Sequence, residues 1–440
     1  MGNIINIIAF LILNATFLVF MFRYSARLKN PLNSSKFLLL EGPEMFLVIL
    51  FATGTLALSS SGGGQGTGSG LNLQAIRLAL LEALLVMSYF MASHKPTWGI
   101  GTISYLVYMI WLLYSMTYSG AGQYGWRYIL KYIYPLLIML SASAIVRDEE
   151  VFLAICVWTR RVAVCSLFVF FFPFVNRIIG GLFWYATALS IHYVIIICIS
   201  LALYFFYGRD IKDLILAIIF VFPCIFMVHR TGLLATFGAI AVFCFYKYKW
   251  ISLPYIAGVL AVGLGIVFYV PSFHNKMFWK DKENTLTVAD LREGNISEED
   301  IRNNGREAVW EMLKEEFYYG HELKGSGIGS CQKFLYANPT IVKQTHGDYV
   351  QMKCDTGDIG MGLYILIAVM VIVHCFIVNV KPSNPDYIKC CAIIVASSLV
   401  GNYFAMYSDN AVTYTMATTG YPFGFYGAML GMLNKYKSTV

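Results

Sequence analysis

The sequence predicts an all-α protein, a polytopic bundle of transmembrane helices that carries one long polar loop. Three observations predict this class: 58% of the 440 residues are hydrophobic, only 13% are charged, and the mean hydropathy is +0.63. Soluble domains carry about 25% charged residues, and a hydrocarbon core about 30 Å thick needs about 20 apolar residues for each helix. A soluble enzyme, a nucleic-acid-binding protein and a secreted disulfide scaffold are therefore disfavoured.

Apolar runs long enough to enter a bilayer recur along the chain and predict about thirteen spans, in a range of about twelve to fourteen. In order they are 4–22, 43–60, 75–93, 100–118, 129–146, 162–176, 184–207, 213–229, 232–246, 253–270, 359–379, 388–406 and 413–433. The first run lacks a preceding basic residue and a small-residue cleavage site, so we expect a retained span and not a signal peptide.

These runs divide the chain into three parts. Residues 1–270 hold transmembrane helices 1–10, residues 271–356 form the long loop, and residues 357–440 hold the C-terminal transmembrane helices. Long loops without much apolar sequence are often functional, so we expect a mostly helical subdomain in 271–356. A second polar stretch, SSSGGGQGTGSG at 59–70, is typical of a flexible connector.

Basic residues gather in alternate loops, which by the positive-inside rule face the cytoplasm. The N-terminus then lies outside and the C-terminus inside, and the net charge of +7 gives no support for a nucleic-acid partner. Arg160 and Arg161 also permit a second interpretation, in which they begin a span or line its interior. The cytoplasmic set is Arg23, Arg27, Lys29 and Lys36; Lys95; Arg147, Arg160 and Arg161; Arg209 and Lys212; Lys247 and Lys249; Lys381 and Lys389; Lys435 and Lys437.

The long loop contains a predicted helical stretch from Ser297, a plausible N-cap, to Gly320, a plausible terminator. After Gly305, four residues at three-to-four spacing share one face, namely Arg306, Trp310, Leu313 and Phe317. The Arg306 stem either packs on Trp310 with its head in water or serves a site.

The sequence GSGIGS at 325–330 predicts a tight turn, either an ordinary one or one whose amides face an anion. Cys331 and Cys354 share the loop and would form a disulfide only if their geometry and compartment allowed it. The spacing of the Cys, His and carboxylate residues predicts no metal site.

Ionisable residues beside apolar runs are a second place to look for function, because a charge in lipid costs several kcal/mol unless it is paired or faces water. Arg230 separates two apolar runs, and Arg177 lies similarly between FFPFV and IIGGLFWY. For Arg177, snorkelling to headgroups is an equal alternative. We interpret the others as structural polar contacts: Arg77 with Glu82, His192, His229, His374 and Asp409.

The long polar loop ends at THGDYVQMKCDTGDIG, residues 345–360, where sequence apolar enough to enter a bilayer begins again. His346 is therefore predicted at a lipid–water boundary. His346, Gly357 and Gly360 follow a pattern of His, a polar residue, nine residues, Gly, two residues and Gly. Gly347 departs from this pattern at its second position.

Two arginine motifs accompany the histidine pattern. Arg230 is followed four residues later by Leu234, and Gly305, Arg306 and Trp310 form G-R-x-x-x-W ahead of the glycine-rich turn. In this order and at these places, the motifs resemble the bacterial O-antigen polymerase and O-antigen ligase superfamily (Wzy and WaaL). The resemblance covers about residues 225–380.

The resemblance implies a multi-pass glycosyltransferase of the bacterial inner membrane whose active site faces the periplasm. An acceptor sugar hydroxyl would attack the anomeric carbon of an undecaprenyl-diphosphate-linked donor, with inversion and without metal or cofactor. Guanidinium groups stabilise a leaving diphosphate, and a neutral imidazole can accept the hydroxyl proton. We therefore expect His346 as general base, Arg306 and Arg230 as catalytic diphosphate clamps, and Arg177 as a weaker third candidate.

Three further side chains are candidates for substrate binding. Asp348 would orient the base or bind sugar, or be a solvated loop carboxylate. Tyr349 and Trp310 offer faces for a sugar or simply pack.

The resemblance leaves several activities open. We expect a polymerase that joins lipid-linked repeat units; the alternatives are a ligase that transfers glycan to lipid A core, another lipid-linked glycan transferase, and a flippase or transporter. A transporter more often shows internal repeats. The expected partners are the lipid-linked glycan donor and acceptor, membrane lipid and, as a candidate, a chain-length regulator protein.

Overall fold

The computed structural model describes residues 2–33, 35–54, 73–90, 95–172, 174–175, 186–208, 210–278, 306–338 and 344–439. The predicted connector at 59–70, the candidate Arg177, and the predicted helix start near Ser297 and Gly305 lie outside these ranges. Within them the chain is almost entirely helical, as predicted, with a single two-stranded hairpin of β1 (Ala26–Lys29) and β2 (Phe37–Leu40).

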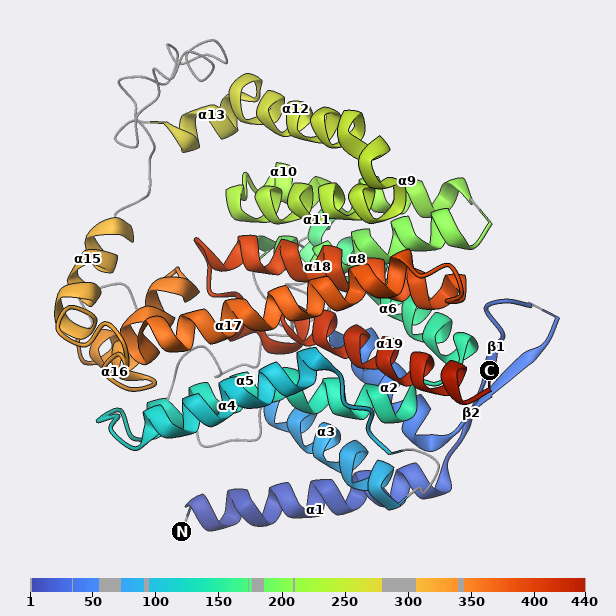
Figure 1. Ribbon diagram of the computed structural model, residues 1–440, viewed down its shortest axis with the longest axis horizontal. Coiled ribbons are helices and arrows are strands. Elements are labelled where there is room, and N and C mark those ends of the chain that lie inside the picture. Colours follow the sequence, from blue (N-terminus) through green and yellow to red (C-terminus); the bar gives the residue numbers. More distant parts are fainter. Residues whose placement is uncertain are drawn as a thin grey trace.

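The helices lie side by side along the long axis of the molecule (Figure 1). The longer ones are α1 (Gly2–Arg23), α2 (Gly42–Gly54), α3 (Leu73–Phe90), α4 (Ile100–Met116), α5 (Gln123–Ile145), α6 (Glu149–Phe171), α8 (Ala186–Phe206), α11 (Arg230–Tyr248), α12 (Leu253–Tyr269), α17 (Asp348–Val380), α18 (Asp386–Met406) and α19 (Gly420–Thr439). Shorter ones are α9 (Ile211–Ile219), α10 (Phe222–Phe226), α13 (Pro271–Met277), α15 (Arg306–Phe317), α16 (Ser330–Ala337), η1 (Lys249–Ser252) and η4 (Ala411–Ala417).

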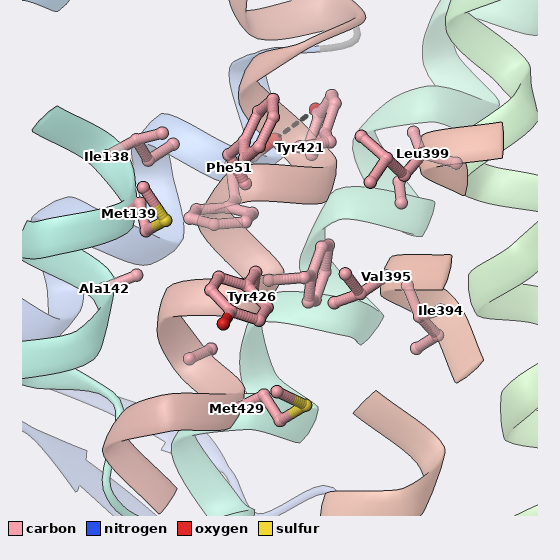
Figure 2. Close-up of a cluster of buried hydrophobic side chains, with 14 of the residues drawn as sticks. Phe51, Ile138, Met139, Ala142, Ile394, Val395, Leu399, Tyr421, Tyr426 and Met429 are labelled. Carbon is pink, nitrogen blue, oxygen red and sulfur yellow. Dashed lines mark hydrogen bonds between the residues drawn. The ribbon is translucent and has the colours of Figure 1, made fainter. Parts of the chain in front are cut away.

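The centre of the bundle is α19, which packs on α5 and α18. Figure 2 shows this core, where the Tyr421 hydroxyl donates a hydrogen bond to the Phe51 carbonyl at 2.5 Å and Tyr426 lies between α5 and α18. Helices α19 and α5 lie very close together, since a Cβ on Gly427 of α19 would lie 2.1 Å from the carbonyl oxygen of Met139 on α5. An apolar helix with little solvent-facing surface is typical of the interior of a large bundle.

By length and composition, five helical segments among the described residues can cross a membrane: Gln123–Ile145, Glu149–Phe168, Arg230–Tyr269, Asp348–Val380 and Asp386–Met406. Four shorter apolar helices accompany them, at Ile7–Arg23, Gly42–Gly54, Ile100–Met116 and Ser190–Phe206. Several apolar helices identify a membrane protein, while the number of spans stays a prediction.

Two predicted boundaries were wrong. The span predicted at 162–176 belongs to α6, which already begins at Glu149, where two glutamates in the first turn favour a helix N-terminus. Arg160 therefore lies inside a helix, in agreement with the second interpretation of this residue, and its guanidinium pairs with Asp213 of α9. The span predicted at 213–229 is divided into α9 and α10.

The second half of the long loop packs against the start of α17 at one end of the bundle, opposite the end that holds β1, β2 and the C-terminus (Figure 1). Helix α17 starts at Asp348, nine residues before the predicted boundary, and kinks at Gly357, whose φ is 69°. The amides of Asp358 and Ile359, which follow the kink, donate to the carbonyls of Glu322 and Leu323 at 2.7 and 3.3 Å. The loop thereby satisfies donors that the kink leaves without helical partners.

The glycine-rich turn is an ordinary structural turn. The amides of Ser326 and Gly327 donate to the carbonyls of Cys354 and Asp355, and the Asp355 carboxylate accepts from the amides of Gly329 and Cys331 at 3.0 Å each. Because these amides already have protein acceptors, the anion-binding alternative is disfavoured.

Cys331 and Cys354 are free, buried thiols in the small core between α15, α16 and α17. From the sequence alone, the two cysteines could form a disulfide or stay as free thiols. Burial raises the pKa of the Cys331 thiol, and the neighbouring Cys354 adds to that effect.

Candidate functional site

His346 lies in the short segment before α17, in the left-handed region of the backbone with a φ of 49°. Non-glycine residues adopt this conformation rarely, although histidine does so more often than most. Its backbone N–H donates to Oδ1 of Asn410 at 3.0 Å, and its Nδ1 lies 3.3 Å from Nδ2 of the same amide. The ring is thus held by a loop more than sixty residues away in the chain.

Arg306 begins α15 and reaches the same loop. One guanidinium nitrogen donates to the Ser408 carbonyl at 2.5 Å. Burial lowers the pKa of Arg306, while the negative charge of Asp409 raises it. An arginine remains protonated in proteins, so burial leaves a positive charge with reduced hydration beside His346. That charge and burial both lower the pKa of His346.

Arg230 is the first residue of α11, and its Nη1 lies 3.8 Å from the Met277 sulfur on α13. The adjacent Lys276 donates from Nζ to the Val228 carbonyl at 2.8 Å. Burial lowers the pKa of Lys276, and the nearby charges of Arg230 and Arg306 lower it further. The three cations therefore gather in one place. We call Arg230, Lys276 and Arg306 the cation cluster.

The residues Ser408, Asp409 and Asn410, which follow α18, connect these elements, and we call them the 408–410 segment. Ser408 contacts Arg306 through its carbonyl and the Thr231 hydroxyl through its own hydroxyl, at 2.5 Å. Asp409 lies 3.4 Å from Nε2 of His229, the N-cap of α11. Asn410 binds His346. One short segment therefore positions the beginnings of α11, α15 and α17.

Asp348 is buried and structural in this arrangement. Its carboxylate accepts from the Val412 amide at 3.0 Å and so fixes the chain just beyond the 408–410 segment. It is neither a solvated carboxylate nor, among the described residues, a hydrogen-bond partner of His346. The structure supports an indirect role, through the loop that holds the imidazole.

Trp310 and Tyr349 flank the site. The Trp310 indole N–H donates to the Thr345 carbonyl at 2.8 Å, and its ring meets that of Tyr407 edge to face with centroids 6.2 Å apart. The Tyr349 hydroxyl donates to the Tyr403 carbonyl at 2.7 Å. Both rings are held by polar contacts, so their orientation is fixed before any substrate arrives.

An apolar groove of about 330 Å³ lies between α11, α17 and α18. Its walls include Leu234, Tyr349, Ile372, Tyr403, Phe404 and Tyr407. On each helix a groove residue lies close to a site residue: Leu234 is one turn from Arg230, Tyr349 three residues from His346, and Tyr407 next to Ser408. Since residues four apart share a helix face, Leu234 of the groove and Arg230 of the cation cluster lie on the same side of α11.

The structure thus brings together Arg230, Arg306 and His346, as predicted, and adds residues that the sequence did not indicate as functional. Lys276 lay in an unremarkable stretch, and His229 and Asp409 were interpreted as structural contacts. One local signal could have indicated His229: it directly precedes Arg230 at the predicted start of a helix, where a side chain can cap the first turn. Within the described ranges, no three Cys, His or carboxylate side chains are grouped to hold a metal ion.

The fold and the site together are those of a helical membrane protein that holds a cation cluster beside a half-buried imidazole, with an apolar groove between α11, α17 and α18. Residues 214–365 match the family model Wzy_C, described as O-antigen ligase. The match confirms the resemblance to the O-antigen ligase and polymerase superfamily, whose members are membrane glycosyltransferase-like enzymes. Arg230, Arg306 and His346 lie inside it, whereas the 408–410 segment lies beyond it. No curated protein matches the chain.

Proposed function

We propose that the protein is a polysaccharide polymerase that joins oligosaccharide units carried on undecaprenyl diphosphate, at the periplasmic face of the bacterial inner membrane. One observation carries the proposal: the cation cluster lies beside His346, and the apolar groove is lined by residues that are close to these groups in the chain, such as Leu234, Tyr349 and Tyr407. A lipid diphosphate has two chemically opposite parts, an anionic head and a long hydrocarbon tail. The cluster suits the head and the groove suits the tail.

Charge supports the assignment of the head. Three half-buried cations attract an anion strongly, because hydrogen bonds from guanidinium and ammonium groups to phosphate are roughly twice as strong as neutral ones. As the bond to the sugar breaks, negative charge builds on the diphosphate oxygen, and fixed donors stabilise that charge without reorganising. Arg306 and Arg230 are the proposed catalytic clamps, and Lys276 is a third cation beside them.

The reaction is an inverting glycosyl transfer. The oxygen of an acceptor hydroxyl bonds to the anomeric carbon of the donor sugar, the bond from that carbon to the diphosphate oxygen breaks, and the electron pair leaves with the lipid diphosphate. The hydroxyl proton passes to a base. His346, the base expected from the sequence, and Asp409 are the two groups in this part of the described chain that suit that role. Trp310 and Tyr349 are proposed to contact sugar rings.

Polymerase is preferred over ligase because of Gly347. Where the ligase pattern has a polar side chain, this chain has a glycine, and the Trp310 indole occupies the space above it. The acceptor side of the site therefore differs from that pattern. The description of the matched family model favours the ligase, which would use the same chemistry with lipid A core as acceptor.

Reconstitution separates these activities. The full-length protein in liposomes receives undecaprenyl-diphosphate-linked repeat units alone or with lipid A core, and products are sized by mass spectrometry. Oligomers of the repeat unit without lipid A core are the expected result. Transfer that requires lipid A core would make the protein a ligase. Movement of the lipid-linked unit between leaflets without any new glycosidic bond would make it a transporter and overturn the proposal.

A further inference from the structure

The Asn410 side chain fixes which nitrogen of His346 carries a proton. The His346 backbone N–H can only donate, and it points at one atom of the Asn410 amide at 3.0 Å, so that atom is the oxygen. The other end of the amide is then the NH2 group. It lies 2.8 Å from Gln344 Oε1 and 3.3 Å from His346 Nδ1.

An NH2 group donates and does not accept, so Nδ1 of His346 must be the acceptor. In a neutral imidazole with an accepting Nδ1, the proton is on Nε2. If Nδ1 of His346 carried a proton, its N–H would face an N–H of the Asn410 side chain, and two donors cannot form a hydrogen bond. Burial and the Arg306 charge lower the pKa of His346, against a smaller opposite effect of Asp409, and so favour the neutral ring. In this state Nε2 is a hydrogen-bond donor with no lone pair to take a proton.

Asp409 is held as a carboxylate by the same kind of argument. His229 Nδ1 accepts from the Gly232 amide at 3.1 Å as the cap of α11, so its proton is on Nε2, which lies 3.4 Å from Asp409 Oδ2. Asp409 Oδ1 accepts a hydrogen bond from the backbone N–H of Asn410 at 2.7 Å. A carboxylate has about four acceptor positions, so capacity remains for a hydroxyl, and 12% of the side chain is exposed.

We propose that His346 and Asp409 divide the work of the transfer: His346 donates a hydrogen bond from Nε2 to the departing diphosphate, and Asp409 takes the proton of the acceptor hydroxyl. Asn410 and His229 are the positioning residues that set these roles. This inference rests on the proposed function and revises the role expected for His346. The proton moves from the hydroxyl to the carboxylate as the new bond forms, and water removes it after the product leaves.

The titratable and charged groups around the two residues determine how the activity depends on pH. On the His346 ring they are Arg306 of α15 and Asp409. On the Asp409 carboxylate they are Arg306, His229 and His346. Burial raises the pKa of Asp409, but His229, His346 and the backbone N–H of Asn410 outweigh this effect and lower the pKa. Asp348 of α17 and His192 of α8 also interact electrostatically with Asp409.

The first test compares His346→Gln with His346→Ala in the reconstituted polymerisation assay. Glutamine keeps an N–H donor but is not a base near pH 7. We expect His346→Ala to lower kcat by about 10²–10³, the usual effect of removing one donor to a developing negative charge, and His346→Gln to recover at least tenfold of this loss. Equal inactivity of the two variants, with both folded by thermal unfolding, would show that His346 is the base.

The second test uses Asn410→Asp, whose carboxylate accepts from both the His346 backbone N–H and Nδ1–H. The neutral ring then loses its Nε2 proton, and only the imidazolium keeps a donor there. We expect the kcat of this variant to fall as pH rises above about 6.5, the ordinary histidine pKa, while the wild type shows no such fall. If His346 is a base, the loss occurs instead as pH falls, in both proteins. Asn338→Asp, at the end of α16, is the charge-matched control.

Asp409→Asn tests the base itself. Loss of a general base lowers kcat by about 10²–10⁴ and leaves KM nearly unchanged, whereas a purely positioning role predicts a change mainly in KM. A kcat within tenfold of wild type would reject Asp409 as the proton acceptor. Absence of any transfer by the wild-type protein would instead reject the proposed function, so the two failures are distinguishable.

Discussion

The indole of Trp310 covers Gly347 so closely that a Cβ on Gly347 would lie 3.0 Å from Cζ2 of the ring. The same ring donates to the carbonyl of Thr345, the residue before His346. The glycine therefore allows α15 to approach the segment that carries the imidazole. Because its φ is −177°, the requirement is for space and not for a left-handed backbone.

Gly347→Ala tests this requirement. Added volume in a packed site costs about 1–3 kcal/mol, and here the displaced ring would move Thr345 and His346. We expect a lower unfolding temperature and at least a tenfold loss of polymerisation. Gly362→Ala, at a position on α17 with no atom within 4 Å of the new Cβ, is the matched control. Full activity of Gly347→Ala would show that Trp310 moves freely.

Gly357→Ala should detach the loop from α17. Its φ of 69° strains any residue with a side chain, and its Cβ would lie 2.3 Å from the Leu323 carbonyl oxygen, a backbone atom that cannot turn aside. The substitution should cost more than about 1 kcal/mol. Limited proteolysis near 320–325 measures the detachment, and Gly265→Ala in α12 is the control. Cleavage no faster than in the control would contradict this account of the kink.

The cation cluster should determine the affinity for the diphosphate. Lys276→Gln removes one charge near Arg230 and Arg306. A hydrogen bond to a charged group is worth about 1.5–3 kcal/mol, so KM for the lipid-linked donor should rise about tenfold to hundredfold. Lys333→Gln is the control, because Lys333 bonds to the Gly120 carbonyl away from the cluster. An unchanged KM for Lys276→Gln would remove that lysine from the site.

His346 should make stability depend on pH. Its pKa is lowered in the folded protein, so folding favours the neutral ring, and its contribution is present above the ordinary pKa of about 6.5 and lost as pH falls below it. The unfolding temperature of His346→Gln should therefore decline less than that of the wild type between pH 7 and pH 5. Parallel declines would show that the ring titrates alike in both states.

Filling the groove should discriminate between donors by tail length. Ile372→Trp places an indole in the groove, whereas Leu366→Trp places one on an exposed part of the same helix. We expect the first variant alone to raise KM for an undecaprenyl-linked donor, with little effect on a donor carrying a short prenyl chain. Equal effects on both donors would locate the tail elsewhere.

The helical class and the meeting of Arg230, Arg306 and His346 could be predicted from sequence, because hydropathy and ordered motifs depend on residues close together in the chain. The break between α9 and α10 was not predicted, although Pro223 in the first turn of α10 was a local signal for a helix boundary. The helical placement of Arg160 was one of two alternatives. Its ion-pair partner Asp213 could not be predicted, because it lies fifty-three residues away in the chain.

Lys276 and Asn410 of the site could not be predicted either, because their contacts are also distant in the chain. Lys276 joins the cluster only because α13 folds back on the start of α11, where Phe273 packs with Leu233. Asn410 binds His346 across sixty-four residues. A lone lysine and a lone asparagine in polar loops carry no signal of their own, so their roles emerge only with tertiary structure.

The 408–410 segment also has a consequence for biogenesis. During translation, Arg230, Arg306 and His346 all leave the ribosome before the segment that orients them. Under the proposed function, the nascent chain would therefore meet its lipid-linked substrates while its reactive groups are still unaligned. Competence would arrive abruptly, once the penultimate helix has inserted, and a chain terminated anywhere before Ser408 would be inert however well its earlier helices had folded.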